Sequence, residues 1–112
     1  MDEETLDKLN ESIQLFEESL LRHFIISAYV VVPELDDEQL AWKKVAGAWC
    51  LMLHSPSKNQ AVSLLTTSIR KRVECSKVIP RLLQALMTAR DEQVRNIEEA
   101  TKAYTLAASG FI

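Results

Sequence analysis

Glycine, proline and cysteine are scarce in this chain, which has two, three and two of them among 112 residues. An all-β sandwich normally carries more glycine and proline at its turns, so the composition argues against that class. Two cysteines without a CxxC spacing are too few for a disulfide-built miniprotein. With two glycines there is also no phosphate-binding loop and no dinucleotide-binding fingerprint.

Long apolar runs are also missing. The most apolar stretch, residues 24–32, falls well short of the roughly 20 residues that a membrane-spanning helix needs, and Pro33 follows it directly. The N-terminus is acidic, whereas a secretory signal begins with basic residues. We therefore expect no membrane contact, a cytoplasmic location, and reduced core thiols at Cys50 and Cys75.

The residue patterns that mark common catalytic and metal sites are missing too. The Glu-x-x-His motif of di-iron bundles fails at both histidines, because leucine stands three residues before His23 and three residues before His54. The two histidines are also too far apart in the sequence to indicate zinc, and no serine lies in a nucleophile elbow. We therefore expect no catalytic residues, no metal, no cofactor and no small-molecule substrate.

What the chain does contain is apolar residues at helical spacing. They make up 47% of the sequence, too many for a disordered chain and enough for a core at this length. Their spacing of three and four residues predicts a single helical domain over residues 1–112. We expect an all-α fold, an antiparallel bundle of three or four helices, with a last helix that is either separate or long and kinked at Pro80.

The first predicted helix begins at Asp2 or Thr5 and ends near Val31. Five of its apolar residues recur at alternating spacings of three and four, which places them on one stripe. They are Leu6, Leu9, Ile13, Phe16 and Leu20. The run from Ile25 to Val32 is ambiguous, because consecutive valines are poor helix formers and favour a strand as the alternative. Pro33 ends the element in either case.

Two further helices are predicted over residues 37–54 and 59–78, joined as an antiparallel hairpin by the break at Pro56. The apolar stripe of the first is Trp42, Val45, Trp49 and Met52, and that of the second is Val62, Leu65, Ile69 and Val73. Gly47 is expected to allow a close approach between helices. The last helix runs to about Ala108. Pro80 could be its first residue, but residues 77–79 offer no Gly, Asn or Asp for a loop, which favours a kink or a very tight turn. Phe111 and Ile112 either dock on the bundle or lead into further chain.

Charge is divided along the sequence. Residues 1–57 carry a net charge of −7 and residues 58–112 carry +4, although the whole chain has only −3. One interpretation is that an acidic first helix packs beside a basic third helix within one molecule. The other is that the basic half of one copy meets the acidic half of another.

These features favour a non-enzymatic interaction protein, such as an adaptor, a small chaperone or an assembly subunit, that presents helical surface to a protein partner. A homodimer through the first helix, or through the first and last helices, is the expected self-association. The predicted partner-binding residues are Leu6, Leu9, Ile13, Phe16, Leu20, Arg70, Lys71 and Arg72. The alternative is a nucleic-acid-associated regulator that uses the basic cluster Arg70-Lys71-Arg72, although the negative net charge argues against it.

Overall fold

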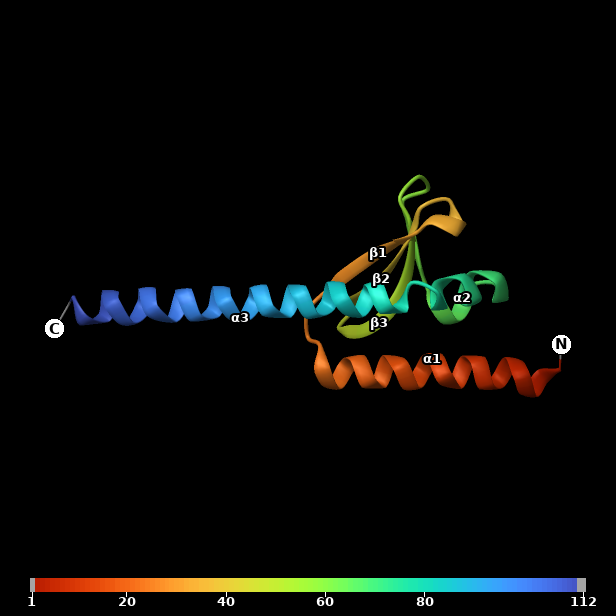
Figure 1. The fold of residues 1–112 in the computed structure, drawn as a ribbon, viewed down its shortest axis with the longest axis horizontal. Coiled ribbons are helices and arrows are strands. Elements are labelled where there is room, and N and C mark those ends of the chain that lie inside the picture. The colour runs from red at the N-terminus through yellow and green to blue at the C-terminus, as the bar shows by residue number, and fades with distance from the viewer. Residues whose placement is uncertain (1, 111–112) are drawn as a thin grey trace.

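A computed structural model of the chain describes residues 2–110, so the predictions for Phe111 and Ile112 fall outside the described residues. The elements are α1 (Glu3–His23), β1 (Ala28–Val32), β2 (Glu38–Val45), β3 (Ala48–Ser55), β4 (Gln60–Ser63), α2 (Ile69–Ser76) and α3 (Ile79–Ser109). Short 3₁₀ turns, η1 (Pro33–Leu35) and η2 (Leu64–Thr66), follow β1 and β4. The strands form one antiparallel sheet in the order β1-β2-β3-β4 (Figure 1). The predicted all-α helical bundle is therefore wrong, and the fold is α+β.

Helix α1 occupies the first part of the predicted first helix. The Asp2 carboxylate caps it by accepting a hydrogen bond of 2.7 Å from the Thr5 backbone N–H. The helix ends at His23, well before Val31, and the chain then turns into β1. The strand alternative for residues 25–32 is thus confirmed over Ala28–Val32, where β-branched side chains fit a pleated surface better than a helix.

The second predicted helix, over residues 37–54, is wrong. These residues form the β2–β3 hairpin, in which Val45 pairs with Ala48 across a two-residue turn. Ala46 and Gly47 both have positive φ, 51° and 87°, as a type I′ turn requires. Gly47 therefore serves chain reversal and not the predicted contact between helices.

The third predicted helix, over residues 59–78, is also replaced by shorter elements. The chain forms β4, then η2, and only then the eight-residue helix α2. The Ser68 hydroxyl accepts from the Lys71 backbone N–H and caps α2 at its start. Lys77 and Val78 separate α2 from α3, and Pro80 lies in the first turn of α3, where its missing N–H costs no helical bond. Pro80 therefore begins a separate helix and does not kink a longer one.

Alternate residues of the strands face the helices and form the core with them. Helix α3 packs on β1 and helix α1 packs on β3, and both helices contribute to the same cluster. Leu40 and Trp42 of β2 lie at its centre with 0% exposure, beside Leu82 and Leu86 of α3. The Trp42 indole N–H donates to the Phe24 carbonyl at 3.1 Å, so this buried polar atom is satisfied. The helices and the sheet thus form two layers around one core.

Helix α3 is much longer than the sheet that it covers. Its first part, which holds the buried Leu82 and Leu86, packs on β1, and the rest extends away from the body, as the blue end of the ribbon shows (Figure 1). The molecule measures 70 × 30 × 26 Å as a result. None of the helices described over residues 2–110 has a stretch both long and apolar enough to cross a bilayer.

Candidate partner-binding surface

The predicted seam of α1 faces the molecule's own core. Leu20 is 2% exposed, and Ile13 and Phe16 pack against the core cluster. Leu6 and Leu9, nearer the N-terminus, are half-buried. The stripe was thus correctly placed on one face of a helix, but its central residues are covered by the sheet and by α2 and α3. Whether any of them also binds a partner stays a prediction.

A small apolar cavity of about 170 Å³ remains between α1 and the helices α2 and α3. Leu9 and Ile13 line it from α1, and Cys75 and Ile79 line it from the other side. Its size is about that of a few water molecules, and nearly all of its lining is apolar. We therefore interpret it as imperfect packing of α1 against the body.

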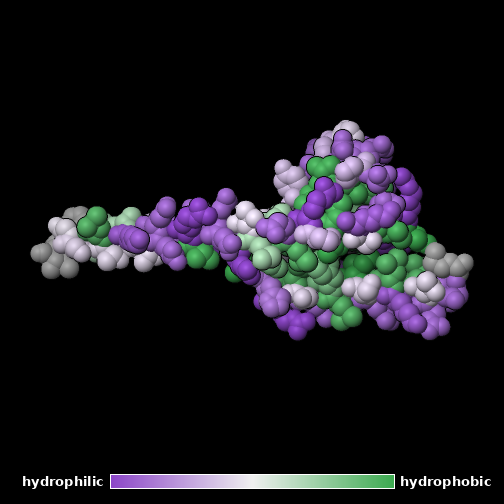
Figure 2. Space-filling model, viewed as in Figure 1, coloured by the Kyte–Doolittle hydropathy of each residue, from purple (hydrophilic) through white to green (hydrophobic). Residues whose placement is uncertain are grey.

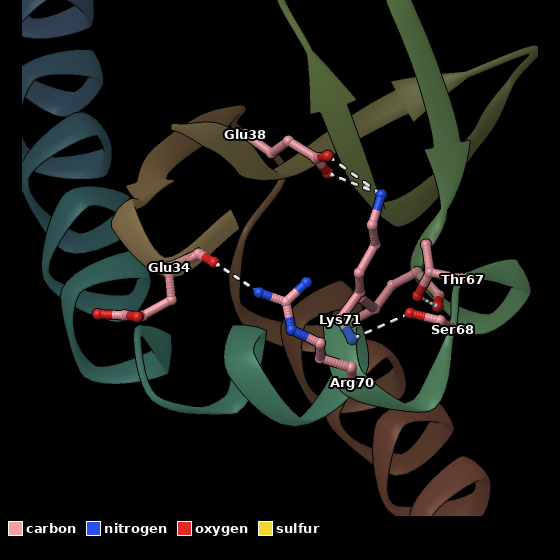
Figure 3. Close-up of polar contacts among 7 residues, drawn as sticks. Glu34, Glu38, Thr67, Ser68, Arg70 and Lys71 are labelled. Carbon is pink, nitrogen blue, oxygen red and sulfur yellow. Dashed lines mark hydrogen bonds and ion pairs between the residues drawn. The ribbon is translucent and has the colours of Figure 1, made fainter. Parts of the chain in front are cut away.

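The predicted basic cluster contacts other parts of the chain, as Figure 3 shows for two of its residues. The Arg70 guanidinium donates to the Glu34 carbonyl at 3.1 Å, and the Lys71 ammonium lies 3.1 Å from the Glu38 carboxylate. Arg72 donates to the Asn10 side chain of α1. The Lys71–Glu38 ion pair joins the basic and acidic halves within one molecule. The three residues thus anchor α2 to η1, β2 and α1, and a partner would have to compete with these contacts.

An acidic residue of α1 also serves the fold. The Glu17 carboxylate accepts a 2.9 Å hydrogen bond from the Leu51 backbone N–H, just before the point where β3 begins to pair with β4 at Met52. An amide at an unpaired sheet edge needs an acceptor, and the helix supplies one. This contact ties α1 to the edge of the sheet.

The cysteines do not form a reactive pair. Both are free; Cys75 is buried, and Cys50 is half-buried. Burial raises the pKa of the Cys75 thiol to about 11, with the carboxylates of Glu38 and Glu74 contributing. Burial also raises the pKa of Cys50. Thiols held in the protonated form are poor nucleophiles.

No group of three or more His, Cys, Asp or Glu side chains that could hold a metal ion occurs within residues 2–110.

The largest exposed element is the far half of α3, which we call the α3 arm and define as residues 91–110. Every residue of the arm is exposed. Figure 2 shows it as a narrow rod in which apolar side chains interrupt a polar surface. Its large apolar residues are Val94, Ile97, Tyr104 and Leu106, with exposures from 49% to 79%. Most helical stability in proteins comes from packing of an apolar face, and within the described residues the stripe of the arm has no such packing.

The apolar stripe of the arm continues the face of α3 that packs on the sheet. Positions 11 residues apart on a helix lie about three turns apart and within roughly 20° of the same direction. Ile97 therefore projects in nearly the same direction as the buried Leu86, and Tyr104, 22 residues beyond the buried Leu82, lies within roughly 40° of the direction of Leu82. Val94, Thr101 and Ala108 flank them. Leu106 points to the opposite side of the helix.

A groove marks the point where this stripe leaves the body. It has a volume of about 440 Å³ and lies between Ile26, in the link from α1 to β1, and the side of α3 that carries Ala89, Gln93 and Ile97. Ile26 itself packs against the core cluster. The groove thus connects the core of the body to the stripe of the arm.

The sequence contained a signal for this surface. The apolar residues of α3 appear irregular when they are counted by steps of three and four from Leu83, because the stripe is interrupted at Arg90 and Thr101. A step of 11 residues from Leu86 leads to Ile97 and then to Ala108, which both lie on the stripe. What the sequence could not show was that the sheet covers only the first half of it.

Comparison of the chain with protein-family models, with curated proteins and with solved structures finds no match in any of the three. The interpretation of the site therefore depends on its geometry.

Proposed function

We propose that the protein is a non-enzymatic protein–protein interaction module, as an adaptor or assembly subunit would be, and that the α3 arm is its partner-binding element. The observation that carries the proposal is the exposure of all residues of the arm, together with an apolar stripe that continues the core-facing side of the same helix. A stripe of this kind is the pattern by which one helix recognises another.

The different contacts that the three helices make support this proposal. The stripe of α1 packs on the body, and the basic residues of α2 bind groups of the same chain. The stripe of the arm, in contrast, is exposed along its whole length within the described residues. We also propose a cytoplasmic location, for which the two free thiols give support.

Site-specific photo-crosslinking in the cells that make the chain tests the proposal. A photoreactive amino acid is placed at Ile97, on the stripe, and in a second variant at Leu106, on the opposite side of the arm. Both positions are apolar and more than half exposed, so they are matched in accessibility. We expect a discrete protein adduct from position 97 and little or none from position 106. Equal labelling at the two positions, or no adduct at either, would contradict the proposal.

A further inference from the structure

We infer that the partner of the α3 arm is a second copy of this chain, and that the two arms pair antiparallel. The inference rests on the proposed function, because it names the partner of the same surface. Three observations lead to it: the direction in which the stripe is open, the charges beside the stripe, and the groove at Ile26.

The body of the protein permits only one direction of pairing. The stripe is continuous along α3, but β1 covers it as far as the start of the arm. In a parallel, in-register pair, residues 79–90 of the second copy would have to lie on the face that β1 already occupies. In an antiparallel pair, each arm runs toward the body of the other copy, so the exposed half of each stripe is covered and the face that β1 occupies is not needed.

The stripe of the arm sets the register of this pair. Residues 91–109 span nearly 30 Å as a helix, at about 1.5 Å per residue. Packing Ile97 of each copy against Tyr104 of the other places the twofold axis between Ala100 and Thr101. The interface is then closed, because the same patch is used on both copies.

Charges on one flank of the stripe are complementary in this register. Glu98 and Lys102 lie on the same side of the arm, and antiparallel helices bring like flanks together. Glu98 of one copy then lies about one residue along the axis from Lys102 of the other, and the same contact recurs across the twofold axis. Asp91 lies opposite Gly110 of the other copy and Glu92 lies opposite Ser109, so no acidic pair is forced together.

The groove at Ile26 suits the end of the second arm. In this register Gln93, which lines the groove, faces Ala108 of the second copy. The last residues of the arm before position 110 are small, namely Ala107, Ala108 and Ser109. Small side chains let a helix approach closely, so the end of the second arm can lie in the groove beside Ile26 without displacing it.

Light scattering and sedimentation of the purified full chain test the inference. We expect a particle of twice the 12.7 kDa chain mass that dissociates on dilution. Ile97→Glu places a charge at the centre of the interface and should raise the dissociation constant about tenfold or more. Leu106→Glu is the matched control and should leave the dissociation constant unchanged. A wild-type chain that remains monomeric at all concentrations, or equal effects of the two variants, would overturn the inference.

Disulfide trapping tests the direction of the pair. In a Cys50→Ala background, Gln93→Cys and Ala108→Cys chains are mixed and oxidised, with Cys75 protected by its burial. The antiparallel pair predicts a disulfide between the two different chains and none within either chain alone. A Gln93→Cys chain that dimerises with itself would show a parallel pair and would overturn the arrangement.

The two proposals fail in different ways. If the arm binds another protein, photo-crosslinking at Ile97 still gives an adduct, but not one of twice the chain mass, and the purified chain is monomeric. That result would overturn the inference that the partner is a second copy, but it would leave the proposed function as an interaction module in place. If the arm binds nothing, there is neither an adduct nor a dimer, and both proposals are overturned.

Discussion

At the scale of single residues, polar side chains in this protein mostly satisfy groups of its own backbone or its own charges. Asp2 caps α1, Ser68 caps α2, and the Trp42 indole is paired with a carbonyl. Lys71 pairs with Glu38 across the boundary between the basic and acidic halves. These contacts are short and specific, so the loss of one should be measurable as a decrease in the free energy of unfolding.

Replacement of Glu17 should expose the cost of an unpaired amide. Glu17→Ala leaves the Leu51 N–H at the sheet edge without its acceptor, and we expect a loss of about 1–2 kcal/mol in the free energy of unfolding. Glu17→Gln keeps an oxygen acceptor and should lose less. Urea denaturation measures both, with the exposed neighbour Glu18→Ala as a control expected to stay within about 0.5 kcal/mol of wild type. Equal losses for the alanine and glutamine variants would argue against the hydrogen bond.

The Cys75 thiol should make stability depend on alkaline pH. Its pKa is raised from the ordinary value of 9.0 to about 11, mainly by burial. Below pH 9 the thiol is protonated in both states, so its contribution is fully present. Between about 9 and 11 only the folded state keeps the proton, so stability falls as the pH rises.

Cys75→Ala removes this dependence and isolates it from other titrating groups. At neutral pH the variant should be less stable by about 1 kcal/mol, because it leaves a small void. Urea denaturation at a series of pH values should show this difference shrinking between pH 9 and 11. A difference that stays constant across the series would contradict the assignment.

At the scale of elements, the hairpin and helix α3 show how neighbours decide a segment's structure. Residues 37–54 carry an apolar stripe at helical spacing, yet they form two strands. The centres of both strands are buried on both faces, because Ala41 and Met52 are only 8% exposed on the side opposite the helices. Continuous burial hides the alternation that normally marks a strand. In the sequence, the only local sign of the hairpin was Gly47, at the position where the chain reverses.

The hairpin turn should respond oppositely to changes at its two positions. Ala46→Asn creates the Asn-Gly pair that type I′ turns prefer and should raise the free energy of unfolding by about 0.5 kcal/mol. Gly47→Ala meets no heavy atom within 4 Å, so it tests φ strain alone and should lower the free energy of unfolding by about 1 kcal/mol. Urea midpoints of the two variants check this. If both variants destabilise the protein equally, the turn is not type I′.

At the scale of the whole molecule, the shape is set by the mismatch between α3 and the sheet. A compact chain of this length has a radius of gyration of about 13 Å, whereas that of this chain is 18.1 Å. The difference arises because the arm extends beyond the body. A second arm lying along the first would cover the stripe and place the two bodies at opposite ends of a paired rod.

A charge exchange should test the proposed pair at this scale. Lys102→Glu leaves Glu98 of the other copy facing an acid, and we expect the dimer dissociation constant to rise about threefold to tenfold at low salt. Adding Glu98→Lys in the same chain restores opposite charges and should recover most of the loss. Sedimentation of wild type, single and double variants measures this, and high salt should reduce the differences. No recovery in the double variant would contradict the antiparallel register.

The sequence by itself determined the local features that depend on near neighbours. The cap at Asp2, the stripe on one side of α1 and the end of an element at Pro33 are all set by residues within a few positions of each other. The strand option at residues 25–32 followed likewise from β-branched residues. These elements could be predicted because their energetics are local.

The tertiary structure alone decided what lies inside and what lies outside. A stripe at helical spacing looks the same whether its own sheet or another molecule covers it, so the sequence could not show that the seam of α1 packs inward while that of the α3 arm stays open. Nor could it show that residues 37–54 are strands, since their core-facing residues are buried in a cluster with residues of α1 and α3, which lie far away in the chain. Burial depends on which distant segments meet, and only the folded chain brings them together.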